Sequence, residues 1–154
     1  MYNFISKKED DTILFASSFA SYLKNGDVIV LTGELGSGKT KFTQGILKHF
    51  GLDNEISSPT FTIVNEYHKD SINIYHFDVY RLSDADEFYA IGGDEYFNNG
   101  ICIIEWGELI KDALPKDYLH IIFSKDENDF ESRHLNIIPH GERFSNFDFS
   151  KILN

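Results

Sequence analysis

The chain has 154 residues, of which 42% are apolar and 25% charged, a balance typical of one soluble domain of ordinary size. Its 14 basic and 25 acidic side chains give a formal net charge of −11, and a surface of that sign repels the phosphates of nucleic acids. Autonomous binding of DNA or RNA is therefore disfavoured, and a protein of this charge that serves RNA needs a basic partner to hold the polymer.

The first third of the chain is expected to contain two helices around a buried strand. Apolar residues recur at helical spacing from 9 to 24, and this helix is expected to stop before Gly26. The segment 27–32 is a short, continuous apolar run, as in a central strand that is buried on both faces. A second helix is expected over 39–50, with Gly51 as its cap.

The middle of the chain is expected to contain a β-hairpin and a short helix. Segments 61–67 and 72–78 both have the pattern of strands, and a polar turn separates them. Acidic residues that follow Ser83 favour a short helix around Phe88, which Gly92 and Gly93 end.

The last third is expected to add three strands and one helix. A strand over 101–105 leads into a helix over 106–113. Strands over 118–123 and 134–138 are joined by a polar loop and resemble a closing hairpin. The tail from Gly141 shows no clear pattern.

The order of these elements predicts the fold class. No linker rich in Pro, Gly or Ser interrupts the chain and no repeat occurs, so residues 1–154 are expected to form a single domain. A strand, a glycine turn and a helix, followed by strands that alternate with short helices, predict an α/β fold. The expected architecture is a three-layer sandwich about a central mixed sheet.

Apolar runs and cysteine use bear on the location of the protein. No run approaches the roughly 20 residues that cross a bilayer, and the first eight residues lack the apolar core of a signal peptide. The single cysteine, Cys102, can form no internal disulfide, and no zinc-binding spacing is present. We therefore expect a cytoplasmic protein without membrane contact, in which Cys102 is a buried strand residue.

The strongest motif is GELGSGKT, which matches G-x-x-x-x-G-K-[ST] at every fixed position between an expected strand and an expected helix. Its glycines let backbone N–H groups turn toward phosphate oxygens, Lys39 reaches the β- and γ-phosphates, and Thr40 offers a hydroxyl to Mg²⁺. The alternative is a glycine turn followed by a chance Lys-Thr pair, which is rare in this context. The motif predicts a P-loop NTPase-like domain, whose nucleotide-binding residues are Gly33, Glu34, Leu35, Gly36, Ser37, Gly38, Lys39 and Thr40.

Two carboxylates end the strands that are expected to flank this loop. Asp78 ends segment 72–78 and Glu105 ends segment 101–105. Either alone has the alternative of a solvated acid at a strand end, but beside an intact P-loop we expect both to function. One carboxylate would hold the Mg²⁺ shell and the other would position or deprotonate the attacking water, and the sequence leaves open which does which. The catalytic candidates are Lys39, Asp78 and Glu105, and the metal candidates are Thr40, Asp78 and Glu105.

Two further residues have two interpretations each. Thr60, in the segment SSPT, lies where P-loop proteins place the switch that senses the γ-phosphate, or it simply opens a strand after a proline turn. His76 precedes Asp78 on the same strand, in what we take as the opposite register, and is either structural or orders the site.

Several classes of nucleotide-dependent protein remain to be separated. The D-x-x-G and N-K-x-D patterns of GTPases do not occur in the chain. A small-molecule kinase usually closes an arginine-bearing lid, yet the arginines are only Arg81, Arg133 and Arg143, with no lid-like insertion between them. A kinase therefore stays the second candidate, and a non-catalytic nucleotide-binding adaptor would not need Asp78 and Glu105.

Four ordered motifs, GELGSGKT, SSPTFTIVNEY, YHFDVYRL and IIEWGE, resemble the bacterial TsaE family, also called YjeE. The resemblance runs from about Asp10 to Trp106 and more loosely to Gly141. It implies an ATPase needed for the threonylcarbamoyl modification of adenosine 37 in tRNAs that read ANN codons. Members of the family work with the TsaB–TsaD pair, in which TsaD carries out the transfer, and hydrolyse ATP to support repeated turnover.

The resemblance also assigns roles to residues. It implies ATP on the segment 33–40, Thr40 and Glu105 on Mg²⁺, Asp78 as the second catalytic carboxylate and Thr60 as the switch threonine. The tRNA would be reached only through the TsaB–TsaD complex, in agreement with the acidic charge, and few arginines predict weak ATPase activity without partners.

No motif marks the adenine pocket. The segment Glu9 to Thr12 and the late strand near Arg133 are the parts expected to reach the base.

Overall fold

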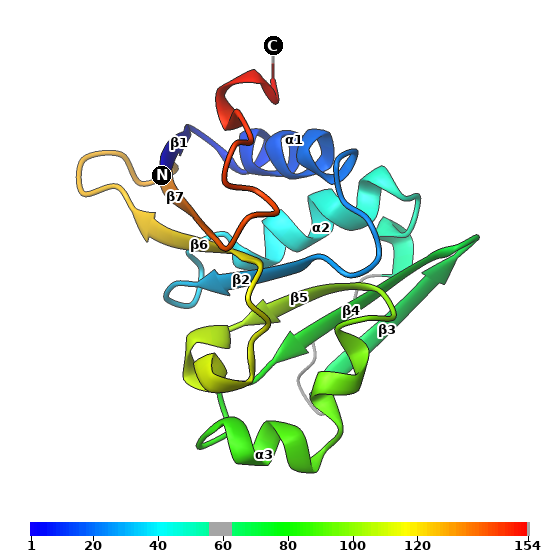
Figure 1. The fold of residues 1–154 in the computed structure, drawn as a ribbon. Helices are drawn as coiled ribbons and strands as arrows, with labels where there is room; N and C mark the ends of the chain where they lie inside the picture. The colour runs from blue at the N-terminus through cyan, green and yellow to red at the C-terminus, as the bar shows by residue number, and fades with distance from the viewer. Residues whose placement is uncertain (56–62, 154) are drawn as a thin grey trace.

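The computed structural model describes residues 1–55 and 63–153, so Thr60 and the start of the strand expected over 61–67 lie outside the described residues. Within them, one seven-stranded sheet has the order β1-β7-β6-β2-β5-β4-β3 (Figure 1). The strands and helices are β1 (Tyr2–Ser6), α1 (Glu9–Ala20), β2 (Val28–Thr32), α2 (Lys39–His49), β3 (Val64–Lys69), β4 (Ile72–Asp78), α3 (Ala85–Ala90), β5 (Ile101–Glu105), β6 (Tyr118–Lys125) and β7 (Arg133–His140).

The sheet is mixed, as the sequence predicts. Strands β6, β2, β5 and β4 are parallel neighbours, whereas β7, β1 and β3 join the two sides antiparallel. Because the carboxyl ends of parallel strands meet at one edge, the chain that follows β2, β4 and β5 gathers there. Strand β2, the most central of them, leads directly into the glycine-rich loop.

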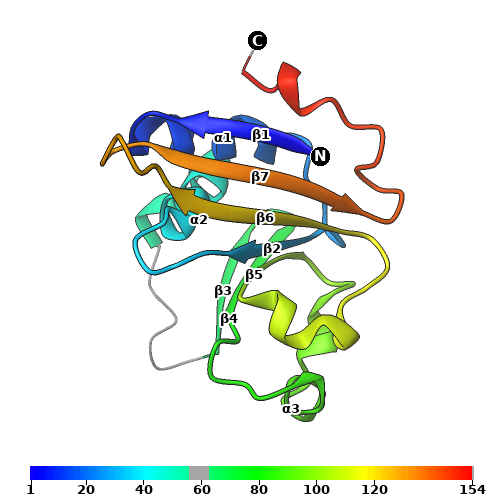
Figure 2. The same cartoon turned by 90° about the vertical axis from the view of Figure 1, so that its left-hand side faces the viewer.

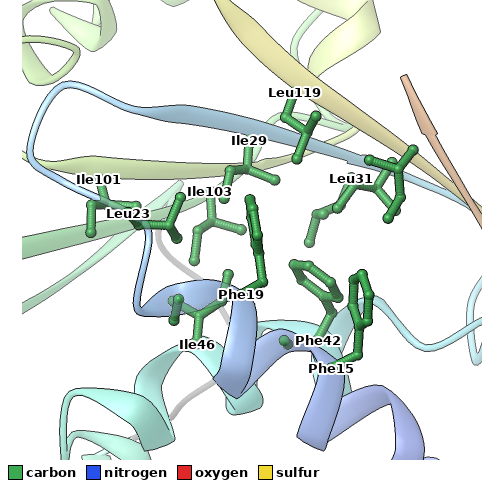
Figure 3. Packing of buried hydrophobic residues seen from close by; sticks show 14 of the residues in the cluster. Phe15, Phe19, Leu23, Ile29, Leu31, Phe42, Ile46, Ile101, Ile103 and Leu119 are labelled. Carbon is green, nitrogen blue, oxygen red and sulfur yellow. The ribbon is translucent and has the colours of Figure 1, made fainter. Parts of the chain in front are cut away.

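Helices cover both faces of the sheet, which confirms the three-layer sandwich (Figure 1). Helices α1 and α2 lie on one face, where Phe15, Phe19 and Phe42 point toward the strand residues Ile29 and Leu31 (Figure 3). On the other face, α3 and the 3₁₀ segment Gly107–Ala113 pack against a second core. The buried side chains of this second core include Val30, Phe77, Phe88, Ile104 and Ile110.

Gly45 lets α1 and α2 pack closely. A Cβ at this position would lie 2.5 Å from the Ile13 carbonyl oxygen and 2.6 Å from the Ala16 Cβ, and neither α1 neighbour is a flexible side-chain end. The absence of a side chain therefore sets the distance between the helix that follows the glycine-rich loop and the helix beside it.

We expect Gly45→Ala to destabilise the fold by about 1–3 kcal/mol, the usual cost of overpacking. Helix propensity alone predicts the opposite sign, a gain of about 1 kcal/mol. Urea unfolding followed by circular dichroism measures the difference, and Lys48→Ala, at an exposed position of the same helix, is the control, expected within about 0.5 kcal/mol of wild type. A more stable Gly45→Ala protein would show that the helices can separate at no cost.

Two predicted helices differ from the observed ones. Helix α1 ends at Ala20 rather than at residue 24, because the Tyr22 and Leu23 N–H groups bond three residues back and the Asp27 carboxylate accepts the Lys24 N–H. The helix expected over 106–113 is a 3₁₀ segment that is kinked at Ile110.

Both ends of the chain contribute structure that the sequence analysis does not predict. Strand β1 pairs with β7 at the edge of the sheet, and the tail that follows β7 returns over α1 (Figure 2). Phe144 and Phe149 of the tail are buried in the α1 face, and Arg143 bonds the Asp27 carboxylate at 2.9 Å. An edge strand of five residues and an aperiodic tail carry little periodic signal, which explains why both are missed.

The expected environment of Cys102 is confirmed. Its side chain is fully buried in β5, and burial raises the pKa of the thiol to about 12. In the described part of the chain, every helix is too short or too polar to traverse a lipid bilayer.

Candidate nucleotide-binding site

The glycine-rich loop joins the end of β2 to the start of α2, as its motif predicts. Gly36 has φ 80° and Gly38 has φ 114°, left-handed values that side chains rarely adopt. Gly38 is also the first residue before α2, whose leading N–H groups have no carbonyl acceptor within the helix. The loop therefore presents backbone donors and the positive end of a helix dipole, an arrangement that favours anions.

A cavity of about 730 Å³ opens over this loop. Residues from all over the chain line it: Glu9, Thr12, Glu34, Leu35, Gly36, Gly38, Lys39, Thr40, Lys41, Ile63, Asp78, Tyr80, Arg81, Leu82, Glu105, Trp106, Glu131 and Arg133. The two carboxylates at the strand ends, Asp78 and Glu105, are among them. Glu9, Thr12 and Arg133, from the segments that are expected to reach the base, also line the cavity. Of the expected loop residues, Gly33 and Ser37 do not line the cavity.

Lys39 lies buried at the base of the cavity, with 7% of its surface exposed. Its Nζ donates to the Gly33 carbonyl oxygen at 2.6 Å and lies 3.8 Å from Glu105 Oε1. The same ammonium lies 4.4 Å from the centre of the Trp106 ring, which adds a cation–π contact. A cation so placed can exchange these partners for phosphate oxygens that enter the loop.

The two predicted carboxylates lie side by side. Asp78 and Glu105 are register partners on β4 and β5, so both side chains project on the same face of the sheet. Asp78 accepts the Tyr80 N–H at 3.0 Å, while Glu105, with only 8% exposed, has Oε2 at 2.6 Å from His76 Nε2. His76 therefore shares the face of Asp78, and the expected opposite register is wrong, because residues two apart in a strand point to the same side.

The residues of this cavity fit a magnesium ion that arrives with a nucleotide. Thr40, Asp78 and Glu105 all offer oxygen, the ligand that Mg²⁺ prefers. Among the described residues, no group of three or more His, Cys, Asp or Glu side chains forms a complete metal cage. Mg²⁺ typically binds in this way, through one or two carboxylates together with waters and substrate phosphates.

Aromatic and basic groups complete the walls of the cavity. Trp106 has a left-handed backbone, φ 63°, and its ring packs against that of Tyr80 at 5.3 Å between centres, with the two ring planes tilted by 54°. Arg133, on β7, donates from Nε to the Gly36 carbonyl oxygen at 3.3 Å and so ties the β6–β7 hairpin to the loop. Trp106 is not among the site residues predicted from the sequence, and its position directly after Glu105 is the signal that could have found it.

A series of hydrogen bonds behind the loop is also not predicted from the sequence. The Thr32 hydroxyl donates to Glu108 Oε1 at 2.6 Å and, with its proton used, accepts from His120 Nε2 at 2.8 Å. Thr32 is the residue just before the loop, and these bonds tie it to the 3₁₀ segment on one side and to β6 on the other. Burial lowers the pKa of His120, His140 adds to this effect, and Glu108 opposes it.

The lowered pKa of His120 in this set of hydrogen bonds predicts that the stability of the fold depends on pH. Because the pKa of His120 is lower in the folded state, the unfolded chain binds more protons, and stability is lost as the pH falls through about 6.5. His120→Gln keeps a donor near Nε2 but cannot titrate, so its urea midpoint should fall less than that of wild type between pH 7.5 and pH 5. His49→Gln, at an exposed position on α2, is the control. Identical losses in His120→Gln and wild type would contradict the assignment.

Comparisons with known proteins identify the family to which the chain is similar. The model of the family described as threonylcarbamoyl adenosine biosynthesis protein TsaE matches residues 6–135. The TsaE protein of Bacillus subtilis is 39% identical over 136 residues, which are 88% of this chain and 84% of that protein. The TsaE protein of Rickettsia prowazekii is 42% identical over 122 residues, which are 79% of this chain and 83% of that protein.

A solved structure has the same fold. The crystal structure of YdiB from Bacillus subtilis superposes with a TM-score of 0.76 at 34% identity, covering 93% of this chain and 88% of that one. The matched segment 6–135 contains the glycine-rich loop, Asp78 and Glu105. A family model that matches most of the chain, close relatives over most of their length and a P-loop NTPase-like fold lead to one conclusion: the chain belongs to the TsaE family.

Proposed function

We propose that this chain is a Mg²⁺-dependent ATPase that supports the threonylcarbamoylation of adenosine 37 in tRNAs reading ANN codons, in the cytoplasm and together with TsaB and TsaD. Membership of the TsaE family supports the pathway. The observation that carries the enzymatic part is the convergence of Lys39, Thr40, Asp78 and Glu105 on one cavity above a glycine-rich loop.

Each group has a distinct task in this proposal. The backbone N–H groups of the loop and the N-terminus of α2 bind the phosphates, and Lys39 leaves the Gly33 carbonyl to contact them. Mg²⁺, when bound with ATP, neutralises charge on the phosphates. We assign Thr40 and the buried Glu105 to the metal shell and the more exposed Asp78 to the orientation of water.

The charges of the chain support a role inside a larger assembly. Arg81 and Arg133 line the cavity. Arg143 does not, and its guanidinium forms a salt bridge with the Asp27 carboxylate. Because only two arginines are among the described residues that line the cavity, we infer that a partner supplies or orders groups that stabilise the transition state, so the isolated chain is a weak ATPase. The net charge of −11 fits a subunit that leaves tRNA binding to its partners.

The decisive experiment measures ATP hydrolysis by the purified chain, alone and with the TsaB–TsaD pair. Stimulation by the pair that both Lys39→Ala and Glu105→Ala abolish is the expected result. Absence of stimulation, together with phosphate transfer from ATP to a small acceptor in a metabolite mixture, would instead favour a kinase. Stimulation of the tRNA modification that survives Glu105→Ala would favour a nucleotide-binding adaptor.

A further inference from the structure

A buried histidine lies directly behind Glu105. His76 is 2% exposed, its Nε2 is 2.6 Å from Glu105 Oε2, and its Nδ1 has no hydrogen-bond partner among the described residues. A buried polar atom without a partner is costly, and an apolar side chain of similar size would fill the same space without that cost. The one interaction that compensates is the bond to Glu105, which indicates that His76 is placed there for its Nε2.

The bond has a defined direction. An ionised carboxylate can only accept, so His76 Nε2 carries the hydrogen and donates it to Oε2. The second oxygen of Glu105, Oε1, lies on the other side, 3.8 Å from Lys39 Nζ. Glu105 thus has one oxygen tied to the strand behind it and the other turned toward the cavity.

We propose that His76 is a positioning residue, which holds Oε2 of Glu105 so that Oε1 stays turned into the cavity where Mg²⁺ would accompany the nucleotide. A glutamate side chain has several rotatable bonds, and fixing one oxygen removes most of their freedom before the ligand arrives. The inference rests on the proposed function, because it assumes that Glu105 serves the metal. It goes further by assigning the residue that sets the orientation of the carboxylate.

Side chains of different lengths at position 76 provide matched variants. A glutamine amide nitrogen lies as many bonds from Cβ as His76 Nε2, so His76→Gln retains a donor close to Glu105. An asparagine is one bond shorter and leaves its donor near the position of the unpartnered Nδ1. His76→Asn therefore keeps a polar side chain at the position but removes the bond to Oε2.

Trp106, the single tryptophan of the chain, reports on the site because it follows Glu105 and its ring contacts the Lys39 ammonium. The experiment titrates MgCl₂ into the full chain saturated with ADP, follows Trp106 fluorescence, and measures ADP binding separately in EDTA. We expect His76→Asn to weaken the apparent Mg²⁺ affinity about 10-fold or more, the usual effect of removing a group that orients a metal ligand. His76→Gln should stay within about threefold of wild type, and ADP binding in EDTA should be unchanged in both variants.

Several results would overturn the inference. Equal Mg²⁺ affinity in wild type and His76→Asn, or equal losses in His76→Asn and His76→Gln, would show that the donor does not matter. A parallel loss of ADP binding in EDTA would show a general disturbance of the cavity. A wild-type protein that binds ADP without any response to Mg²⁺ would contradict the proposed function itself, and with it this inference.

A double-mutant comparison keeps the test valid if His76→Asn is poorly stable. A residue that acts only through Glu105 has no further effect once that carboxylate is gone. We therefore expect Glu105→Gln and Glu105→Gln/His76→Leu, in which an apolar side chain of similar size removes the donor, to have equal Mg²⁺ affinities, and any further loss in the double variant would contradict the proposal.

Discussion

Lys39→Ala is expected to lower ATP hydrolysis by at least about 100-fold, the loss typical of removing one charge-stabilising donor from an active site. The side chain is 7% exposed and its ammonium contacts the Gly33 carbonyl, Glu105 and the Trp106 ring at the base of the cavity. Its removal leaves the phosphates without this buried cation in both the ground state and the transition state. We therefore expect weaker ATP binding as well as slower turnover, measured by equilibrium binding and by phosphate release in the presence of TsaB and TsaD.

The control for this prediction is Lys48→Ala, which removes an exposed lysine from the last turn of the same helix. It should bind and hydrolyse ATP as wild type does. Because Lys39→Ala also deprives the buried Glu105 of a cationic neighbour, its urea midpoint must be compared with that of wild type. A folded Lys39→Ala protein that hydrolyses ATP within about threefold of the wild-type rate would show that phosphates do not bind on this loop.

Phe19→Ala is expected to cost about 3–5 kcal/mol of stability, the usual effect of deleting a large core side chain. Phe19 is 1% exposed, and its ring centre lies about 6 Å from those of three tail residues. The three are Phe144, Phe147 and Phe149. The truncation opens a cavity between α1, the sheet and the tail at once, so the loss should lie in the upper part of that range.

Thermal unfolding measures this effect, at about 2–4 °C in Tm for each kcal/mol in a chain of this length. Leu14→Ala is the matched control, because Leu14 lies on the same helix with 56% of its surface exposed. It should change stability by no more than about 0.5 kcal/mol. If Phe19→Ala lowers the stability by less than about 1 kcal/mol, the tail does not pack on α1 in solution.

Local signals account for the parts of the fold that sequence analysis predicts well. Strand β2 is a continuous apolar run that leads into a glycine turn, and β5 is one that ends in an acidic residue. Both strands occur where the sequence predicts them. The glycine-rich loop and α2 follow from one motif. Because β4 and β5 end on Asp78 and Glu105, a parallel sheet alone is enough to bring the two carboxylates to one edge.

Contacts between distant segments account for the parts that sequence analysis does not predict. The bond from His76 to Glu105 depends on which strands are neighbours, and the position of Trp106 over Lys39 depends on a left-handed residue that no local pattern marks. The 3₁₀ segment Gly107–Ala113 has helical composition but is kinked where it packs on the sheet. Thr60 lies outside the described residues, so its role as a switch remains a prediction.

The pairing of the sheet also determines when the protein can fold during its synthesis. Strand β2 lies between β5 and β6, and Tyr2 in β1 pairs with Ile137 in β7, so the earliest strands have partners that the ribosome makes late. Folding is slow in such a topology, because the entropy of closing long loops is lost before the strand contacts can stabilise the chain. The glycine-rich loop therefore leaves the ribosome well before the strands that support it, and the cavity above the loop can take its final shape only after β6 and β7 have been made.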